Sequence, residues 1–190
     1  MVARFVLVHG LRTSHSMWRP QLDALAAADI PAITVDLPGH GDRVDASFTM
    51  DAAVEAIADG VAAARETPGE PGPVILVGLS LGGFTSMETV GRHPHLVDGL
   101  VAIGCSTRPN RLGLAFYRNW SVALSRLPNQ GLVIDEMTTR IALGRQAAID
   151  MLSGGRGIAE SAAAVSAVAD LQPLSSVASA ADAGLPIWFV

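Results

Sequence analysis

The chain of 190 residues contains no lysine, and its 13 basic residues are all arginines scattered along the sequence. The formal net charge is −5, so the chain lacks the positive field that attracts nucleic-acid phosphates or anionic lipid. We therefore expect no nucleic-acid partner. The 49% of hydrophobic residues are enough for one sizeable globular core.

Cysteine is also scarce. Because Cys105 is the single cysteine, the chain has no internal disulfide. It also has too few thiolates for a metal site that needs several of them. Cys105 follows the apolar run 100–104, where a small buried thiol is expected. The sequence predicts no metal site and no cofactor.

Long apolar runs are missing as well. The run that ends at His9 is too short for the core of a signal peptide. No later segment reaches the roughly 18 unbroken apolar residues that a membrane span needs. We therefore expect a cytoplasmic protein without a membrane-spanning segment.

What the sequence does have is a regular alternation of short apolar runs and helical patterns. Such runs, rich in β-branched residues, are typical of strands buried on both faces. They cover residues 5–10, 32–36, 74–78, 100–104 and 186–190. Amphipathic helices are predicted between the first four, at 16–29, 49–67 and 81–92. This order predicts an α/β fold with a parallel sheet and helices on both faces.

The alternation stops after residue 107. Three helical stretches then follow without a strand, at 111–127, 132–152 and 157–171. An insertion between two parallel strands is placed to cover the carboxyl edge of the sheet, where open α/β sheets bind ligands. We predict a core sheet domain at 1–107, a helical cap over a pocket at 108–184, and the start of a further core strand at 185–190.

The stretch Gly78-Leu79-Ser80-Leu81-Gly82 lies between a predicted strand and a predicted helix. Small residues let strand and helix pack closely around a strained turn, which exposes the serine hydroxyl above the sheet edge. The N–H of Leu81, at the start of the helix, then points towards whatever the serine attacks. A phosphate-binding turn is the other interpretation, but neither dinucleotide nor P-loop spacing is present.

Four segments in this order resemble motifs of the α/β-hydrolase superfamily. They are an oxyanion loop at Val8–Leu11, a turn at Asp36–Gly41, a nucleophile elbow at Gly78–Gly82, and an acid-bearing strand at Leu185–Val190. The resemblance implies an α/β-hydrolase-type sheet, Ser80 as the nucleophile, and the backbone N–H groups of Leu11 and Leu81 as the oxyanion hole. A serine rather than an aspartate in the elbow favours acyl transfer over the dehalogenase and epoxide-hydrolase branches.

A serine nucleophile needs a general base, and the resemblance implies the order Ser, then Asp or Glu, then His. His93 and His95 follow the helix that starts beside Ser80, so they lie about 15 Å away at its far end. The other histidines precede the nucleophile and are expected to be loop residues without a catalytic role; they are His9, His15 and His40.

The acid has no clear candidate either. Asp36 is expected to bond nearby amides in its turn, and three cap acids are expected on a solvated helix face, namely Asp135, Glu136 and Asp150. The chain ends at Val190, before the positions that the resemblance assigns to acid and histidine. We therefore expect a C-terminally incomplete hydrolase, a fragment with little activity of its own.

Three functions remain open. The first is a serine hydrolase that cleaves a small or medium carboxylic ester, thioester or lactone through an acyl-enzyme at Ser80. The second is a non-catalytic remnant or binding module on the same fold, and the third is a cofactor-free haloperoxidase-like or C–C-bond hydrolase. Four cap side chains offer surface for a pocket, although such residues are more often core: Phe116, Tyr117, Trp120 and Met137.

Overall fold

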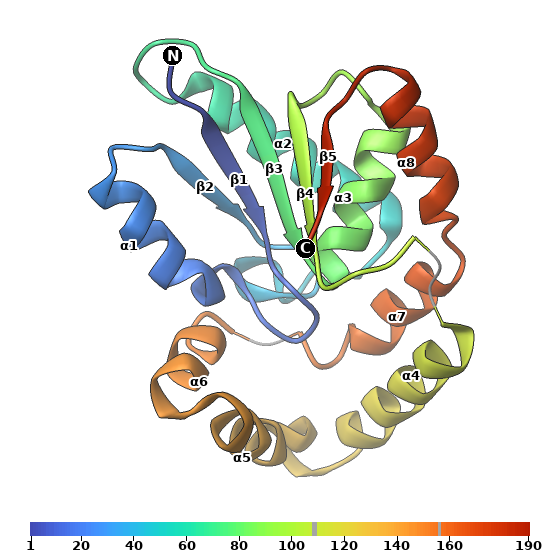
Figure 1. Ribbon diagram of the computed structural model, residues 1–190. Coiled ribbons are helices and arrows are strands. Elements are labelled where there is room, and N and C mark those ends of the chain that lie inside the picture. Colours follow the sequence, from blue (N-terminus) through green and yellow to red (C-terminus); the bar gives the residue numbers. More distant parts are fainter. Residues whose placement is uncertain (108–109, 156) are drawn as a thin grey trace.

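The computed structural model describes residues 1–107, 110–155 and 157–190, so the cap boundary predicted at residue 108 lies outside the described residues. Five parallel strands form one sheet in the order β2-β1-β3-β4-β5 (Figure 1). The strands are β1 (Arg4–Val8), β2 (Ala32–Val35), β3 (Val74–Leu79), β4 (Gly99–Ile103) and β5 (Ile187–Phe189). The predicted strands and the predicted α/β fold are confirmed.

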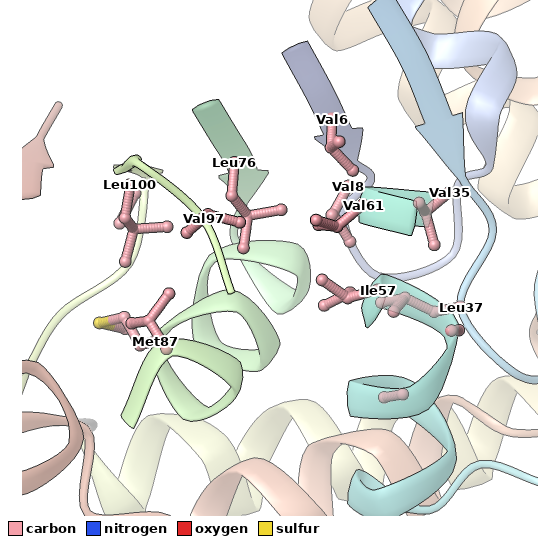
Figure 2. Packing of buried hydrophobic residues seen from close by; sticks show 14 of the residues in the cluster. Val6, Val8, Val35, Leu37, Ile57, Val61, Leu76, Met87, Val97 and Leu100 are labelled. Carbon is pink, nitrogen blue, oxygen red and sulfur yellow. The ribbon is translucent and has the colours of Figure 1, made fainter. Parts of the chain in front are cut away.

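The two faces of the sheet are both apolar, as the unbroken hydrophobic runs require. Because side chains alternate along a strand, Val6 and Val8 of β1 point to one face and Leu7 points to the other. The first face holds the larger core, in which Val6, Val8, Leu76 and Leu100 pack with residues of the covering helices (Figure 2). Burial on both faces is what favours strands over helices in these runs.

Three helices pack on the larger core, and the third of them also lies against the second: α2 (Met50–Glu66), α3 (Leu81–Arg92) and α8 (Pro173–Asp182). On the opposite face, α1 (Arg19–Ala27) follows a short 3₁₀ turn at His15–Trp18. There Trp18 joins Leu7 and Val77, and Leu22 and Leu25 of α1 pack against them.

A polar side chain bonds to backbone groups at each end of helix α2. The Thr49 hydroxyl accepts a hydrogen bond from the Ala52 N–H at 3.1 Å and so caps the N-terminus of the helix. At the other end, the buried Arg4 guanidinium donates to the carbonyl oxygens of Ala64 at 3.0 Å and Arg65 at 2.7 Å. A cation there satisfies carbonyl groups that the helix itself leaves without donors.

Four helices lie beyond the carboxyl ends of the strands (Figure 1). They are α4 (Arg111–Ser125), α5 (Leu132–Leu143), α6 (Arg145–Leu152) and α7 (Ser161–Ala169), with a 3₁₀ turn at Pro128–Gly131. The helix predicted over 132–152 is in fact two helices, because Gly144 adopts a φ of 84° between them. No helix of the described residues is long and apolar enough to cross a membrane.

Helix α8 follows the last helix that the sequence predicts, at 157–171, and it is not predicted because a proline often marks the end of a helix. Pro173 in fact begins α8, where its missing N–H costs no hydrogen bond. The helix packs against α3 beside the sheet, whereas α4–α7 lie over the strand ends (Figure 1). The division into a core, a cap and a further strand remains a prediction.

The strand order reverses at the border between β1 and β3. The chain leaves β1 for β2 on one side of it and later returns to β3 on the other side. Open α/β sheets bind ligands outside the carboxyl ends of strands at such a point. Val8 pairs with both Val35 and Gly78, so the segments that follow β1, β2 and β3 meet at this edge.

The first turn of α3 touches the end of β1 so closely that only glycine fits at position 82. A Cβ atom there would lie 2.3 Å from the carbonyl oxygen of Val8. We predict that Gly82→Ala lowers the free energy of unfolding by about 1–3 kcal/mol, measured by urea denaturation.

The control is Gly113→Ala in α4, where the nearest atom to the added Cβ is 3.7 Å away. This change should leave stability unchanged or raise it by up to about 1 kcal/mol, because alanine is the better helix former. Equal stability of the two variants would contradict the close approach.

Candidate active site

Ser80 occupies a strained turn between β3 and α3. Its φ of 51° and ψ of −110° are unusual for a residue with a Cβ atom, and they cost on the order of 1–3 kcal/mol. The turn is held on both sides, because the Ser80 N–H donates to Ile103 at 2.8 Å and the Ser80 carbonyl accepts from Phe84 at 3.0 Å. The surrounding fold therefore imposes this backbone conformation.

Neighbouring glycines make the turn possible. A Cβ atom at Gly78 would lie 2.3 Å from the carbonyl oxygen of Gly82, and one at Gly83 would lie 2.5 Å from Sγ of Cys105. Glycine lets β3 and α3 approach each other at these positions, as the sequence motif predicts.

The three predicted site residues Ser80, Leu11 and Leu81 line one cavity of about 320 Å³. The loop after β1 runs directly beside the serine, because a Cβ atom at Gly10 would lie 3.8 Å from that of Ser80. The rest of the wall is mainly apolar and comes from the strand ends and from α3, α4, α6 and α7. It consists of Gly10, Thr13, Leu79, Phe84, Leu114, Tyr117, Met151, Val165 and Val168.

Two residues that line this cavity have backbone N–H groups without a hydrogen-bond partner in the part of the chain that the structure describes. Within residues 1–107, 110–155 and 157–190, neither the Leu11 N–H nor the Leu81 N–H has a hydrogen-bond acceptor. For Leu81 this follows from its place in the first turn of α3. A helix N-terminus also favours negative charge.

His9 is a structural residue. It is completely buried, its Nδ1 donates to the carbonyl of Gly10 at 2.7 Å, and its Nε2 accepts from the Leu37 N–H at 3.0 Å. These two bonds require the neutral ring. Burial and the neighbouring His40, whose ring centre is 5.1 Å away, lower the pKa of His9 to about 4.

The other histidines are also unsuited to deprotonate Ser80. His40 is buried with its Nδ1 3.0 Å from the carbonyl of Pro38, and burial lowers its pKa. His93 and His95 follow the far end of α3, whose 12 residues span about 18 Å. Among the residues that the structure describes, no histidine lines the Ser80 cavity.

His15 and Asp36 form an imidazole–carboxylate pair, but the pair joins two loops. The Asp36 carboxylate accepts from the backbone and Nδ1 of His15, both at 2.7 Å, and from the Asp42 N–H at 2.9 Å. Burial works against the charged carboxylate, yet the bonds from Asp42 and His15 outweigh it and lower the pKa of Asp36. The expected turn role of Asp36 is therefore confirmed.

The same three residues place possible metal ligands within 4.8 Å of one another. The hydrogen bonds to Asp36 account for this proximity, since its carboxylate already accepts from three donors.

Cys105 is half-buried, and burial raises the pKa of its thiol to about 11, so it is a neutral thiol at neutral pH.

Two cap acids contradict the expectation of a solvated face. Asp135 and Asp150 are buried and form ion pairs with Arg12 and Arg19, respectively. Spacing along a helix shows that acids share a face, but it does not show that arginines from the core lie opposite. The third acid, Glu136, is partly exposed and pairs within its helix, as a solvated residue does.

The four cap side chains named as pocket candidates are not core residues. Tyr117 lines the Ser80 cavity, and Trp120 lines an adjoining cavity of about 450 Å³. Phe116 and Met137 are instead 70% and 56% exposed.

Comparison with known proteins gives a family and several relatives. The sequence model of the alpha/beta hydrolase family matches residues 5–190. The chain is 37% identical over 99 residues to a pimeloyl-[acyl-carrier protein] methyl ester esterase of Neisseria meningitidis serogroup C, covering 52% of this chain and 35% of that protein. It is 30% identical over 172 residues to the esterase of the same name from Aromatoleum aromaticum, covering 88% and 63%. The chain thus spans less than two thirds of each relative.

A solved structure shows the same fold. A carboxylesterase of Nitrososphaera gargenis superposes with a TM-score of 0.73 over 99% of this chain and 71% of its own, at 16% identity. At that identity the likeness shows the fold alone. Together with the family match, it confirms the α/β-hydrolase resemblance.

The buried neutral His9 predicts a pH-dependent stability. Its folded pKa of about 4 lies below the ordinary histidine pKa of 6.5, so below pH 6.5 the unfolded state binds the proton more readily. The free energy of unfolding should therefore fall as the pH drops from 6.5 to 4, by up to about 1.4 kcal/mol per pH unit.

His9→Gln should flatten this slope in urea denaturation curves measured from pH 7 to pH 4, whatever its effect on stability at pH 7. The control His93→Gln replaces an exposed histidine beyond α3 and should keep the wild-type slope. An unchanged slope in His9→Gln would show that His9 is not the group responsible.

Proposed function

The chain belongs to the alpha/beta hydrolase family, and we propose that it carries the nucleophile and oxyanion site of a serine esterase. The reaction is cleavage of a small or medium carboxylic ester, thioester or lactone through an acyl-enzyme at Ser80. The observation that carries this proposal is a serine in a strained elbow that shares one cavity with Leu11 and Leu81. Relatives named as esterases support the reaction class.

In this mechanism Oγ of Ser80 attacks the acyl carbon and the carbonyl oxygen becomes an oxyanion. The Leu11 and Leu81 N–H groups, which have no acceptor among the described residues, donate to that oxyanion. Each such donor is typically worth about 10²–10³ in rate. Backbone donors explain why apolar side chains are tolerated at positions 11 and 81.

The general base and its acid have to come from elsewhere in the whole protein. His9 and His40 are neutral structural residues, and His15 holds Asp36. The chain also spans only 35% and 63% of the two relatives compared above. We propose that residues following Val190 in a longer protein supply both groups. The 190-residue chain alone would keep only binding and oxyanion stabilisation, which give about 10³–10⁴-fold over water.

The cavity favours an uncharged acyl group of limited length. No charged side chain lines it within the described residues, and its 320 Å³ lies near the lower end of the usual range for ligand pockets. Both relatives are named as methyl ester esterases, so methyl esters, from which methanol leaves, are the first substrates to test.

Ser80→Ala tests the nucleophile directly. In a chain extended past Val190 by its natural sequence, a fluorophosphonate probe should label Ser80, and peptide mapping should locate the label there. Ser80→Ala should lose all labelling, whereas Ser47→Ala, a change at an exposed loop serine, should label like the wild type. A folded, extended wild-type chain that stays unlabelled would favour the non-catalytic alternative.

A panel of p-nitrophenyl and methyl esters tests the acyl preference in the same extended chain. We expect kcat/KM for a hexanoyl ester to exceed that for a hexadecanoyl or a succinyl ester at least tenfold, since the cavity is small and uncharged. Met151→Trp places a larger side chain in the cavity wall and narrows the cavity. It should therefore shift the acyl length with the highest kcat/KM towards shorter groups. Peroxide-dependent halogenation that exceeds ester cleavage would instead support the haloperoxidase-like alternative.

A further inference from the structure

We propose that Arg12 is a positioning residue for the oxyanion site. Through its ion pair with Asp135 of α5, Arg12 fixes the loop that presents Leu11 to the Ser80 cavity, and it thereby makes the cap part of that site. The structural half of this inference stands alone, and the catalytic half rests on the proposed function.

Arg12 is placed to control the Leu11 backbone. It is the next residue along the chain, so their Cα atoms are about 3.8 Å apart and share one peptide unit. Its φ of 61° lies in the left-handed region, which an arginine adopts only where its surroundings hold it. Leu11 itself lines the cavity beside Ser80. A change in the Arg12 backbone therefore moves the peptide next to the proposed oxyanion donor.

The Arg12–Asp135 pair is shielded from water. Each of the two side chains is 11% exposed, and the guanidinium donates to the carboxylate through Nη2 and Oδ1. Asp135 also lies in the first turn of α5, where the helix dipole favours a negative charge. Loss of one partner removes a compensating charge from a partly dry site, which is costly and favours rearrangement of the surrounding backbone.

Helix α5 depends on this contact for its position. Asp135 is the one buried residue among its twelve, all of which the structure describes. The apolar side chains on the opposite face, Val133 and Met137, are 69% and 56% exposed. Helix α5 packs against α6, and the ion pair is the buried contact that orients it towards the loop after β1.

The loop between Gly10 and Ser14 has few other anchors at its tip. Gly10 and Thr13 bond within the loop and to Met17, at 2.9 Å for the Thr13 hydroxyl to the Gly10 carbonyl. His15 is tied to Asp36 at the end of the loop. Arg12 provides the tie from the tip of the loop to another part of the fold.

The pair also lines a second cavity that adjoins the Ser80 cavity. Arg12 and Asp135 line the 450 Å³ cavity, which shares Leu11, Thr13, Tyr117 and Met151 with the Ser80 cavity. A ligand that fills both cavities contacts the loop and the cap together. Through the ion pair, a shift of the cap also shifts the loop.

A second ion pair between core and cap, in which the Arg19 side chain is 51% exposed, provides the control. Nη1 of Arg19 lies 3.1 Å from Oδ1 of Asp150, which joins α1 to α6. Neither residue lines the Ser80 cavity. Arg19→Gln therefore removes a tie between cap and core of the same chemistry but leaves the loop at 10–14 untouched.

Hydrogen–deuterium exchange of the 190-residue chain tests the structural half without any catalysis. We expect Arg12→Gln and Asp135→Asn each to speed exchange of peptides covering 10–14 at least fivefold, and Arg19→Gln to leave it unchanged. The exchanged pair, Arg12→Asp with Asp135→Arg, should restore most of the protection. Should Arg12→Gln fail to fold, Asp135→Asn decides alone. Wild-type exchange at 10–14 in the folded variants would overturn the proposal.

Fluorophosphonate labelling of the extended chain tests the catalytic half. Arg12→Gln should lower the maximal labelling rate of Ser80 about tenfold with little change in the half-saturating probe concentration, because the oxyanion donor and not the binding cavity is disturbed. Arg19→Gln should label as fast as the wild type. Faster exchange with unchanged labelling would overturn the positioning role. A wild-type chain that is never labelled would refute the proposed function, and the exchange result would still decide whether Arg12 holds the loop.

Discussion

The close contact between the first turn of α3 and the end of β1 places the other parts of the site. With only hydrogen atoms at Gly82, the start of α3 lies against the Val8 carbonyl, where a Cβ atom would be 2.3 Å away. The residue between β3 and α3 then has no room for an ordinary turn, and Ser80 adopts a φ of 51°. The loop that leaves β1 beside this contact has to pass the serine, so Leu11 and Ser80 share one cavity.

A buried polar network keeps this edge of the sheet in place. Nε2 of His9 accepts from the Leu37 N–H and so joins the end of β1 to the segment after β2, while Nδ1 donates to the adjacent Gly10 carbonyl. The Asp36 carboxylate joins that segment to His15. These bonds satisfy backbone groups that would otherwise be buried without partners, which is costly in a low-dielectric interior. The network works only with a neutral His9 and an ionised Asp36, and the pKa of each is lowered in the direction that maintains this state.

Local patterns in the sequence predicted the elements that depend on local physics. Runs such as 74–78 predict buried parallel strands because both faces must be apolar, and Gly78 to Gly82 predicts a strained turn because larger residues do not fit. The break at Gly144 and the start of α8 at Pro173 were missed, because glycine and proline are compatible with more than one local structure. The Arg12–Asp135 pair joins residues 123 positions apart, and no local pattern carries that information.

The cap is positioned mainly by directional polar contacts at its α5 and α6 end. Helix α5 buries only Asp135, and α6 buries only Ala148 and Asp150, with both acids paired to arginines of the core. Hydrophobic burial is non-directional and tolerates sliding, whereas an ion pair shielded from water fixes one relative position and is costly to break. Arg12 follows Leu11 directly, so the contact that seats the cap also sets the backbone beside Ser80.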